Sequence, residues 1–480
     1  MSKSNQFNRR QFLQASGAIL GASMLSPMSW AAAKTDVIVI GAGLSGLYAA
    51  DLLEQAGLSV KVLEGRDRIG GRLHTLNEVP GAPEAGGQTI GPNYGRMIYV
   101  AAKNGVPLHN VNFMLGNEPV RQIIHAGGQR ILPTEWATAP QNPFPEAYKS
   151  VLPDRLLNTV MGMPPFDASN AWLNPEFAKL DYPVADLFKA KGINQASIDI
   201  AGISNNYGPR LEEASLLFLH RNNAIVMQSM RTPGGLKMAN GGNQRVPEAM
   251  ARNLKGDVRL NSVVSKIAKA GANYTVTCAD GSEHSAKYVI AAVPFATLRN
   301  VDIQVPLPAI QQEAIQQLAY GKVYQAHFAV ETPFWEGKGF LPNVWSDSVI
   351  ERVFASDPSN VGRITNLTVW INGKGADMIA QLSQKEAEAK IIKSFYEALP
   401  EAKGAVRFVK TYTWTNQAMS KGSFAVWHPG QLARYANTMA LPADNLHFAG
   451  EHTAQWGSGM EGALESGERA ANEIIAKISA

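Results

Sequence analysis

Three glycines near the start of the chain have the spacing that binds a nucleotide diphosphate. Residues 41–46 read Gly-Ala-Gly-Leu-Ser-Gly, directly after the apolar, β-branched run 36–40 and directly before a helical pattern. The first glycine permits a tight turn, the second lets the backbone approach a pyrophosphate, and the third lets helix and strand pack closely. The helix N-terminus adds unpaired N–H groups and a partial positive charge. A second strand, 59–63, ends at Glu64, which can accept hydrogen bonds from a ribose.

The loop after this acid favours FAD over a nicotinamide dinucleotide. It carries glycine and arginine at 65–66 and a Gly-Gly-Arg triplet at 70–72. A nicotinamide enzyme does not need such a loop, whereas flavoproteins of the glutathione reductase type close it over the FAD phosphates, with Arg72 as the expected phosphate partner. The cofactor-binding residues expected in the two loops are Gly41, Gly43, Leu44, Ser45, Gly46, Glu64, Gly65, Arg66, Gly71 and Arg72.

Length and composition indicate a globular protein with more than one domain. The chain has 480 residues, of which 45% are hydrophobic and 18% charged, and a net charge of +4. Without a leader that carries Lys3, Arg9 and Arg10 and no acid, the net charge falls to about +1, which gives no reason to expect nucleic acid or anionic lipid as a partner. The single cysteine, Cys278, excludes an intramolecular disulfide and a cysteine-based metal cluster.

The first 33 residues have the features of a bacterial twin-arginine export signal. Arg9-Arg10 precede Phe12-Leu13, an apolar stretch of small residues runs to about Leu25, and Ala31 to Ala33 offer a cleavage site. The apolar stretch spans only about 14 residues, against roughly 20 for a helix that crosses a bilayer, so a membrane anchor is the weaker alternative. We therefore expect export by the twin-arginine machinery, cleavage near residues 31–34, a periplasmic location and no stable membrane insertion afterwards.

The rest of the chain alternates between two kinds of sequence, which predicts two domains that are each built from separated segments. Glycine-rich turns and short apolar strands give 35–110, 232–300 and 412–480 the character of an α/β, Rossmann-like FAD-binding domain of the glutathione reductase type. Residues 111–231 and 301–411 are expected to form an inserted α+β substrate-binding domain with a mixed or antiparallel sheet. Within the inserted segments, periodicity predicts helices near 184–200, 211–222 and 384–398 and strands at 323–330, 364–371 and 406–412.

Further motifs follow in a characteristic order. They are Glu84-Ala85-Gly86-Gly87, Gly234-Gly235, Pro333-Phe334-Trp335, Trp414 nine residues before Ser423, Phe448 to Thr453, and Met460-Glu461-Gly462-Ala463. With these motifs, the chain resembles the flavin-containing amine oxidase family, which includes monoamine oxidases, polyamine oxidases and L-amino acid oxidases. The resemblance covers nearly everything from residue 36 to residue 478.

The resemblance implies FAD as the cofactor and a role for several residues. Glu451 is expected near the ribityl chain and the pyrophosphate, Val264 at the adenine, and Trp414 beside the isoalloxazine ring, where an ordinary core aromatic is the alternative. Met460 opens a helix whose N-terminal N–H groups would stabilise negative charge on the flavin. The remaining cofactor contacts that the resemblance implies are Gly87, Gln88, Thr89, Gly450 and Gly459.

Two departures from the family concern the flavin attachment and the walls around the amine. Relatives with covalent flavin carry cysteine where this chain has Ser423, and serine cannot form the thioether, so FAD is expected to be noncovalent. Many relatives flank the substrate amine with two tyrosines, which correspond to Phe424 and to Gly459, a residue without a ring. Trp456 is expected to supply the second wall, and a packing role is the alternative.

A third departure concerns the lysine with which the family holds a water against flavin N5. Counting ten residues back from Trp335 gives Gln325, which can hold a water but brings no positive charge. We therefore expect a slower reaction of the flavin with oxygen. Lys322 lies three positions earlier, on the opposite face of a regular strand, and is expected to be a surface lysine.

The substrate is expected to be an amine rather than an α-amino acid. L-amino acid oxidases carry an arginine directly after the Gly-Gly motif for the substrate carboxylate, and this chain has Gln88 there; a buried carboxylate without such a partner is costly. Arg96 and Arg221 are the alternative carboxylate partners. The histidines nearest the expected substrate segments, His220 and His327, are expected to be core or surface residues rather than catalysts.

The resemblance implies FAD-dependent oxidative deamination of a small-molecule amine, by hydride transfer to flavin N5. The imine hydrolyses to an aldehyde or ketone, and the electrons pass to oxygen, giving hydrogen peroxide, or to a periplasmic redox protein. Alternatives are an L-amino acid oxidase, a desaturase or protoporphyrinogen oxidase-like enzyme, and a flavin-binding partner protein without turnover. The side chains expected around the reacting centre are Gln325, Trp414, Phe424 and Trp456.

Overall fold

The structure is a computed structural model that describes residues 35–111, 118–358 and 360–479. The chain divides into Met1–Lys34 and Thr35–Ala480, and the helices and strands given below belong to the second unit. The expected export signal at residues 1–33 lies outside the described residues. Within the described part of the chain, no helix is both long and apolar enough to cross a membrane.

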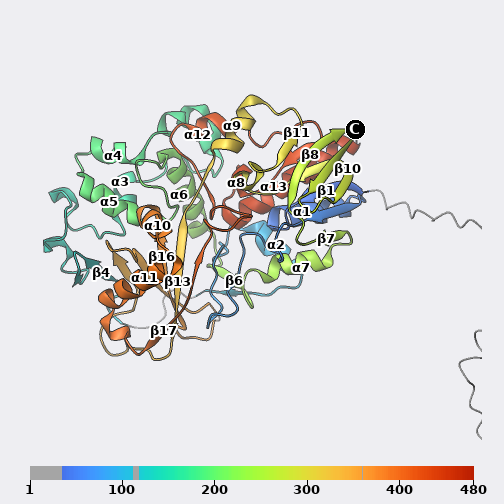
Figure 1. The fold of residues 1–480 in the computed structure, drawn as a ribbon. Coiled ribbons are helices and arrows are strands. Elements are labelled where there is room, and N and C mark those ends of the chain that lie inside the picture. Colours follow the sequence, from blue (N-terminus) through green and yellow to red (C-terminus); the bar gives the residue numbers. More distant parts are fainter. Residues whose placement is uncertain (1–34, 112–117, 359, 480) are drawn as a thin grey trace, which may run out of the picture. The chain divides into compact units, whose positions relative to one another are not determined.

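An eight-stranded sheet carries the nucleotide-binding motif (Figure 1). Its strands are β1 (Thr35–Ile40), β2 (Val60–Leu63), β7 (Asp257–Arg259), β8 (Val264–Ala270), β9 (Asn273–Cys278), β10 (Glu283–Ala291), β11 (Asp302–Gln304) and β19 (Leu446–Phe448), in the order β11-β8-β9-β10-β1-β2-β7 with β19 also against β10. β1 is parallel to β2 and β10, and its apolar run is buried, as expected for a strand covered on both faces. The carboxyl ends of these parallel strands therefore meet at one edge of the sheet, where such folds bind ligands.

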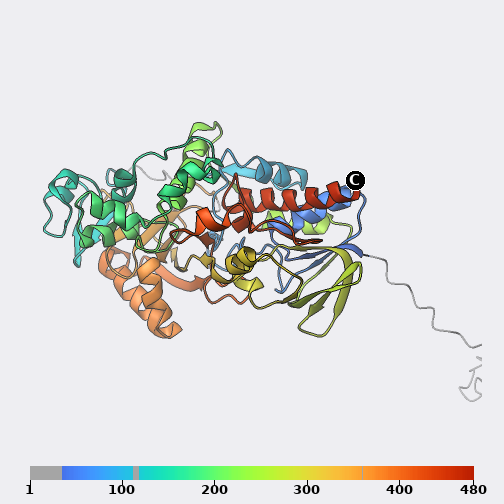
Figure 2. The same ribbon diagram turned by 90° about the horizontal axis from the view of Figure 1, so that it is seen from above.

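Two helices pack side by side on this sheet, α1 (Leu44–Gln55) and α13 (Gly459–Ser479), as Figure 2 shows. Two glycines allow these helices to pack closely against the backbone of neighbouring segments. A Cβ on Gly46 would lie 2.0 Å from the carbonyl oxygen of Gly41, and a Cβ on Gly467 would lie 2.2 Å from that of Ser45. Gly46 thus has the packing role expected from the motif. The neighbouring helices are α2 (Gly95–Lys103) and α7 (Arg245–Asn253).

A second, seven-stranded sheet lies beside the first. Its strands, in order, are β17 (Val406–Thr413), β13 (Val323–Val330), β16 (Asn366–Asn372), β15 (Arg352–Ser356), β14 (Val344–Ser346), β4 (Ile123–Ala126) and β5 (Gln129–Ile131). All neighbours are antiparallel except β14 and β4. α11 (Gln384–Ala398) covers one face, where Phe395 stacks on Phe328 with ring centroids 4.0 Å apart. The opposite face carries Gln325 and Trp370, which are paired across β13 and β16.

The remaining α-helices and strands range from two to 16 residues in length. The helices are α3 (Leu156–Met161), α4 (Val184–Ala190), α5 (Gln195–Ile203), α6 (Leu216–Arg231), α8 (Phe295–Leu298), α9 (Ala309–Gln317), α10 (Gly373–Ala380) and α12 (Gln431–Tyr435). Two further pairs of strands are β3 (Leu108–Asn110) with β6 (Lys237–Ala239), and β12 (Ala319–Tyr320) with β18 (Ala425–Val426).

The predicted α/β class with a second mixed sheet is confirmed. The eight-stranded sheet draws its strands from 35–63, 257–304 and 446–448, and the seven-stranded sheet from 123–131 and 323–413. β11 therefore joins the first sheet although it follows the expected boundary at residue 300, and β17 runs across the boundary at residue 411. The domain division itself stays a prediction.

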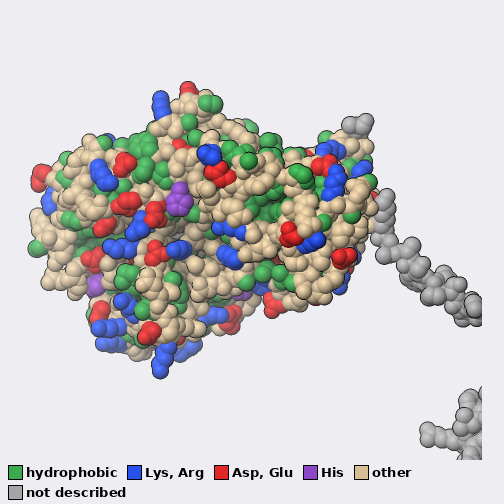
Figure 3. All heavy atoms as spheres, turned by 45° about the horizontal axis from the view of Figure 1, so that its top comes forward, with side chains coloured by type: hydrophobic (Ala, Val, Ile, Leu, Met, Phe, Trp, Pro, Cys, Tyr) green, Lys and Arg blue, Asp and Glu red, His purple; other side chains and the backbone are tan. Residues whose placement is uncertain are grey.

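The molecular surface mixes charges of both signs. On the face in Figure 3, lysine and arginine side chains are interspersed with aspartate and glutamate. Exposed ion pairs such as Lys322 with Asp377, 2.5 Å apart, are part of this surface. Pairs of this kind stabilise a fold by about 1 kcal/mol at most.

Candidate active site

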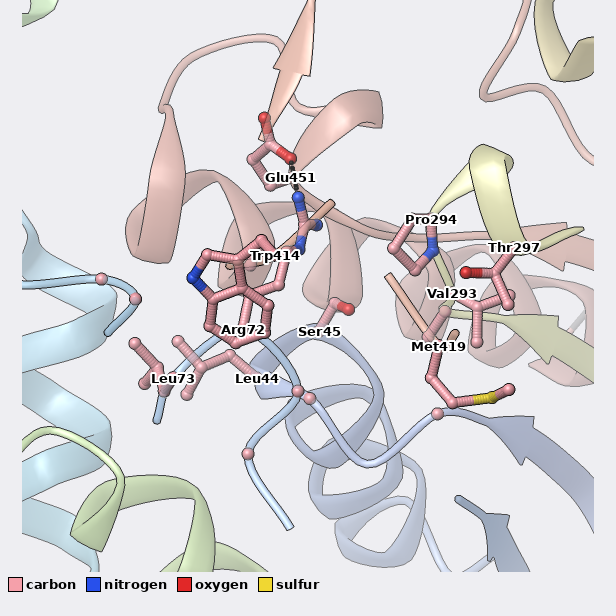
Figure 4. Close-up of a pocket in the computed structure, with 18 of the residues that line it drawn as sticks. Leu44, Ser45, Arg72, Leu73, Val293, Pro294, Thr297, Trp414, Met419 and Glu451 are labelled. Carbon is pink, nitrogen blue, oxygen red and sulfur yellow. Dashed lines mark hydrogen bonds and ion pairs between the residues drawn. The ribbon is translucent and has the colours of Figure 1, made fainter. Parts of the chain in front are cut away.

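A cavity of ≈ 360 Å³ lies at the edge where β1, β2 and β10 end (Figure 4). It brings together residues that are more than 400 positions apart in the chain, from Ile40 to Ala463. The predicted site residues that line it are Gly41, Gly43, Leu44, Ser45, Glu64, Gly65, Arg66, Gly71, Arg72, Gly87, Gln88, Thr89, Val264, Trp414, Phe424, Glu451, Gly459 and Met460.

Two glycine turns meet at the N-terminus of α1 and leave the backbone open to a ligand. A Cβ on Gly71, whose φ is +59°, would lie 3.2 Å from the Cα of Gly43, and a Cβ on Gly43 would lie 3.9 Å from the Cα of Gly71. Side chains would therefore fill the gap in which an anion can approach the helix N-terminus.

The acid at the end of β2 is held rigidly. One Glu64 oxygen accepts from the Ala42 N–H at 2.8 Å and the other from the Arg66 N–H at 2.9 Å. Buried in the same wall, Arg66 Nη2 and Thr297 Oγ1 have no hydrogen-bond partner among the described residues. Burial lowers the pKa of Arg66. Because buried polar groups are normally paired, these two donors fit a ligand rich in acceptors, such as the phosphates and riboses of FAD.

Arg72 is bound to the protein on the inner side of the cavity. Its Nη1 donates to Glu451 at 2.8 Å and to the Ser423 carbonyl at 2.9 Å, and Glu451 also accepts from the Ala425 N–H at 3.1 Å (Figure 4). The expected phosphate partner is thus paired with a carboxylate from the other end of the chain. This pair fixes the loop 70–72 against the segments that carry Ser423 and Glu451.

The aromatic part of the cavity is built from three sequence-distant segments. Trp414 is buried and donates from Nε1 to the Ala85 carbonyl at 2.6 Å. Phe424 packs edge-on against Tyr207 with ring centroids 5.7 Å apart. Trp370 of β16 also lines the cavity. The sequence reasoning missed both Tyr207 and Trp370, because neither belongs to a motif.

The structure does not place Trp456, the expected second aromatic wall, in the cavity. Its side chain is 55% exposed and does not line the cavity. The cause is Glu465 of α13, whose carboxylate accepts the backbone N–H groups of residues 455–457 and fixes the course of that loop. The space beside Gly459 is occupied instead by Tyr94, whose hydroxyl would lie 3.9 Å from a Cβ at Gly459. Tyr94 follows the motif at 84–92, which is the signal that could have found it.

The structure does not place Gln325 in the cavity lining either. Its side chain is 1% exposed and lies behind the wall, where Nε2 donates to the Ala85 carbonyl at 3.3 Å and Oε1 contacts His327 Nε2 at 3.2 Å. The competing hydrogen bonds of Ala85 and His327 hold the amide away from the cavity. Lys322 pairs with Asp377 at the surface, as expected.

Gly46 and Gly450 do not line the cavity, and their roles are in the backbone. Gly450 has a φ of +128° and donates its N–H to Ser466 at 2.9 Å, and a Cβ there would lie 2.5 Å from the ring of His452. The glycine therefore orients Glu451, its neighbour, toward Arg72.

Two histidines near the expected substrate segments and the two arginines that could pair with a substrate carboxylate are held in the protein interior or by ion pairs. Burial lowers the pKa of His220 and of His327 to about 4, so both are neutral at pH 7.

Arg96 pairs with Glu461 and Glu468. Arg221 donates to the carbonyls of Ala454 and Gly457. Neither arginine therefore offers a carboxylate partner in the cavity. Cys278 is buried in β9 and does not line it.

Comparisons with known proteins agree with this geometry. A family model described as flavin containing amine oxidoreductase matches residues 44–475. The flavin-containing amine oxidase B of Mus musculus is 29% identical over 92% of this chain and 86% of its own length, and that of Homo sapiens is 28% identical over the same shares. The solved structure of wild-type putrescine oxidase bound to putrescine matches 92% of this chain and 99% of its own, with 26% identity and a TM-score of 0.74. Cyclohexylamine oxidase from Brevibacterium oxydans IH-35A shares the fold, with 24% identity, a TM-score of 0.75 and coverage of 93% and 100%.

Proposed function

This chain belongs to the flavin-containing amine oxidoreductase family, and from that premise we propose that it oxidatively deaminates a small-molecule amine in the periplasm. It is an FAD-dependent oxidoreductase, and the proposal concerns its substrate, its electron acceptor and its location. The amine is oxidised to an imine, which water converts to an aldehyde or ketone and ammonia.

A single observation carries the proposal. One cavity contains both the diphosphate-binding turns, with Glu64 and the unpaired Arg66 Nη2, and an aromatic wall, with Trp414 and Phe424. A dinucleotide held by the turns therefore shares its cavity with the aromatic faces. Such faces give the amine an apolar surface to pack on and exclude water from it.

The chain's own residues bind and orient the reactants. FAD, when bound, supplies the acceptor for a hydride from the amine carbon. Phe424 and Tyr94 both line the cavity and offer aromatic surface against which the amine carbon can be positioned. The N-terminus of α13 at Gly459 and Met460 meets the cavity, and its N–H groups favour the negative charge that develops when electrons arrive.

The amine must enter in its neutral form, because the cavity offers no free base among the described residues. The Glu451 carboxylate pairs with Arg72, and that of Glu64 accepts two backbone N–H groups. Burial raises the pKa of the Tyr94 hydroxyl, which therefore stays protonated. The proton that an ammonium substrate carries has to be lost to water before binding.

The electron acceptor is oxygen, which gives hydrogen peroxide, or a periplasmic redox protein. The neutral Gln325 in place of the family lysine supports a slow reaction with oxygen, and the twin-arginine leader supports the periplasmic location. The cofactor is held noncovalently, since Ser423 lines the cavity and the chain's one cysteine does not.

Of the alternatives, an L-amino acid oxidase is disfavoured because Arg96 is paired with glutamates, Arg221 Nη2 donates to backbone carbonyls, and neither arginine lines the cavity. The desaturase and the flavin-binding partner protein are disfavoured because the matched relatives are amine oxidases.

The test is anaerobic mixing of the purified holoenzyme with a panel of amines and of their α-carboxylated parents, for example phenylethylamine with phenylalanine. Bleaching of the flavin absorbance by amines supports the proposal, and faster bleaching by the α-amino acids overturns it. The Gly43→Glu variant is the matched control, because a charged side chain in the phosphate gap should give colourless protein that no substrate can bleach.

A further inference from the structure

A row of large polar side chains crosses the seven-stranded sheet next to the cavity. Gln325, Trp370, Arg352 and Trp345 are register partners on β13, β16, β15 and β14. Directly paired residues share one face of a sheet. Because Trp370 lines the cavity, Arg352 lies on the same face, one strand farther from Gln325.

Arg352 is a buried cation that the protein leaves incompletely paired. Its side chain is 5% exposed, and Nη1 donates to Oδ1 of Asn206. Nε and Nη2 have no partner among the described residues, and neither have Nε1 of Trp345 and Nε1 of Trp370. Four buried N–H donors without an acceptor are unusual, since more than nine in ten such groups are paired. All four belong to three consecutive residues of the row.

The nearest acid does not neutralise Arg352 through contact. Glu351 precedes it in the chain, but its carboxylate accepts from the Asn372 N–H at 2.7 Å and the Gly375 N–H at 3.0 Å. Burial raises the pKa of Glu351 to about 7 and lowers that of Arg352 to about 10, so the guanidinium stays charged at pH 7. A rigid guanidinium with open donors is suited to a carboxylate, which it can bind through two parallel hydrogen bonds.

Asn206, the hydrogen-bond partner of Arg352, is an exposed residue. Its Oδ1 occupies the place at Nη1 that an incoming carboxylate oxygen would take. The next residue, Tyr207, packs edge-on against Phe424, which lines the cavity. One short segment therefore connects the guanidinium with the aromatic wall, and displacement of the Asn206 amide would open the guanidinium to a ligand.

We propose that Arg352, with Trp345 and Trp370, binds a carboxylate that the amine substrate carries several bonds away from its amine carbon. This rests on the proposed amine oxidation. Arg352 does not line the cavity and lies one strand beyond Trp370, which does, so the acid group is remote from the amine rather than on the same carbon. Gln88 lines the cavity at the position where L-amino acid oxidases carry the arginine for an α-carboxylate.

The first experiment compares chain-matched substrates with the holoenzyme under anaerobic conditions. Flavin reduction is followed with butylamine, hexylamine and octylamine and with 4-aminobutanoate, 6-aminohexanoate and 8-aminooctanoate. At least one amino acid of the series should have a Kd about 10- to 100-fold lower than its amine. Arg352→Gln should abolish that preference, so that each amino acid binds no more tightly than its matched amine. Arg407→Gln, an exposed arginine on β17 of the same sheet, should change nothing.

A second readout does not depend on turnover. Hexanoate should shift the flavin absorbance of the wild type and of Arg407→Gln, but not that of Arg352→Gln. If Arg352→Gln loses FAD or folds poorly, Arg352→Lys and Trp370→Phe, which keep the charge and the ring respectively, should each weaken hexanoate binding.

The outcomes separate the two proposals. If no amine of either series bleaches the flavin but hexanoate binding requires Arg352, amine oxidation fails and the carboxylate site stands. If amines bleach the flavin and neither the acid preference nor hexanoate binding depends on Arg352, the site is refuted while the function stands. A preference for α-amino acids that is lost in Arg352→Gln would overturn the remote position of the acid group.

Discussion

At the scale of single residues, the position of Ser423 decides how the cofactor is held. It lines the cavity, and its hydroxyl donates to the Gly321 carbonyl at 3.0 Å. With no thiol at this wall, acid precipitation of the holoenzyme should release yellow FAD into the supernatant. Colour that stays with the washed pellet would contradict noncovalent binding.

Gln325 provides a second test at this scale. It lies directly behind Ala85, which lines the cavity, so the longer side chain of a lysine would bring a positive charge closer to the flavin. We expect Gln325→Lys to speed reoxidation by oxygen about tenfold, because a charge stabilises the superoxide-like state by a kcal/mol or more. Stopped-flow measurement of both half-reactions checks this, and flavin reduction should change much less. Unchanged reoxidation would place oxygen activation elsewhere.

The neighbouring His327 should make the fold sensitive to acid. Its folded-state pKa is lowered from 6.5 to about 4 by burial, so the unfolded chain binds the proton more readily. Stability from the neutral ring is therefore complete above pH 6.5 and is lost as the pH falls toward 4. Relative to His327→Gln, the wild type should lose about 2–3 kcal/mol of unfolding free energy over that range. Urea unfolding at pH 7 and pH 4.5 measures it, and a constant difference between the two proteins would argue against a neutral buried ring.

At the scale of elements, the packing of α1 against α13 sets the geometry of the cavity, since both helices begin at its wall. Gly467→Ala would place a Cβ 2.2 Å from the Ser45 carbonyl oxygen. We expect a loss of about 2 kcal/mol or more in unfolding free energy and weaker FAD binding, because the clash is with backbone that cannot turn aside. Gly95→Ala is the control, since no atom lies within 4 Å of a Cβ there. Equal melting temperatures and FAD affinities in the two variants would refute the role of this contact.

Elements with a strong local pattern could be predicted from the sequence. The strand at 323–330 and the helix at 384–398 have the predicted bounds, the latter with a capping box at Ser383 and Glu386. The helix predicted near 184–200 is instead two helices, because Gly192 adopts a φ of +72° between them. The helix predicted at 211–222 begins later, at Leu216, where Ser215 caps it.

The site could be predicted where a motif dictates backbone geometry, as in the turns around Gly43 and Gly71. It could not be predicted where a distant side chain decides an orientation. Trp456 points outward because Glu465 holds the backbone of its loop, and Gln325 points at Ala85 because its amide donates to that carbonyl. Arg352 and Trp370 come together only through strand register, which no local pattern reveals.

At the scale of the whole molecule, the leader should act only as an export signal and contribute nothing to the activity or stability of the enzyme. Replacing Arg9 and Arg10 by lysine should leave active, yellow protein in the cytoplasm, because the export receptor reads the arginine pair. Activity assays on periplasmic and cytoplasmic fractions decide it, and unchanged periplasmic activity would refute the twin-arginine route. Deletion of residues 1–33 should lower the melting temperature little.

The residues that line the cofactor cavity come from both ends of the chain, from β1 to α13, and this has a consequence for the synthesis of the protein. While the ribosome is still adding residues before Leu446, β10 lacks its partner β19, and Arg72 lacks Glu451. The unfinished chain therefore exposes a hydrogen-bonding strand edge, which favours aggregation, and has only part of the FAD-binding wall. Cofactor loading must follow completion of translation, and a bound flavin reports that synthesis has reached α13.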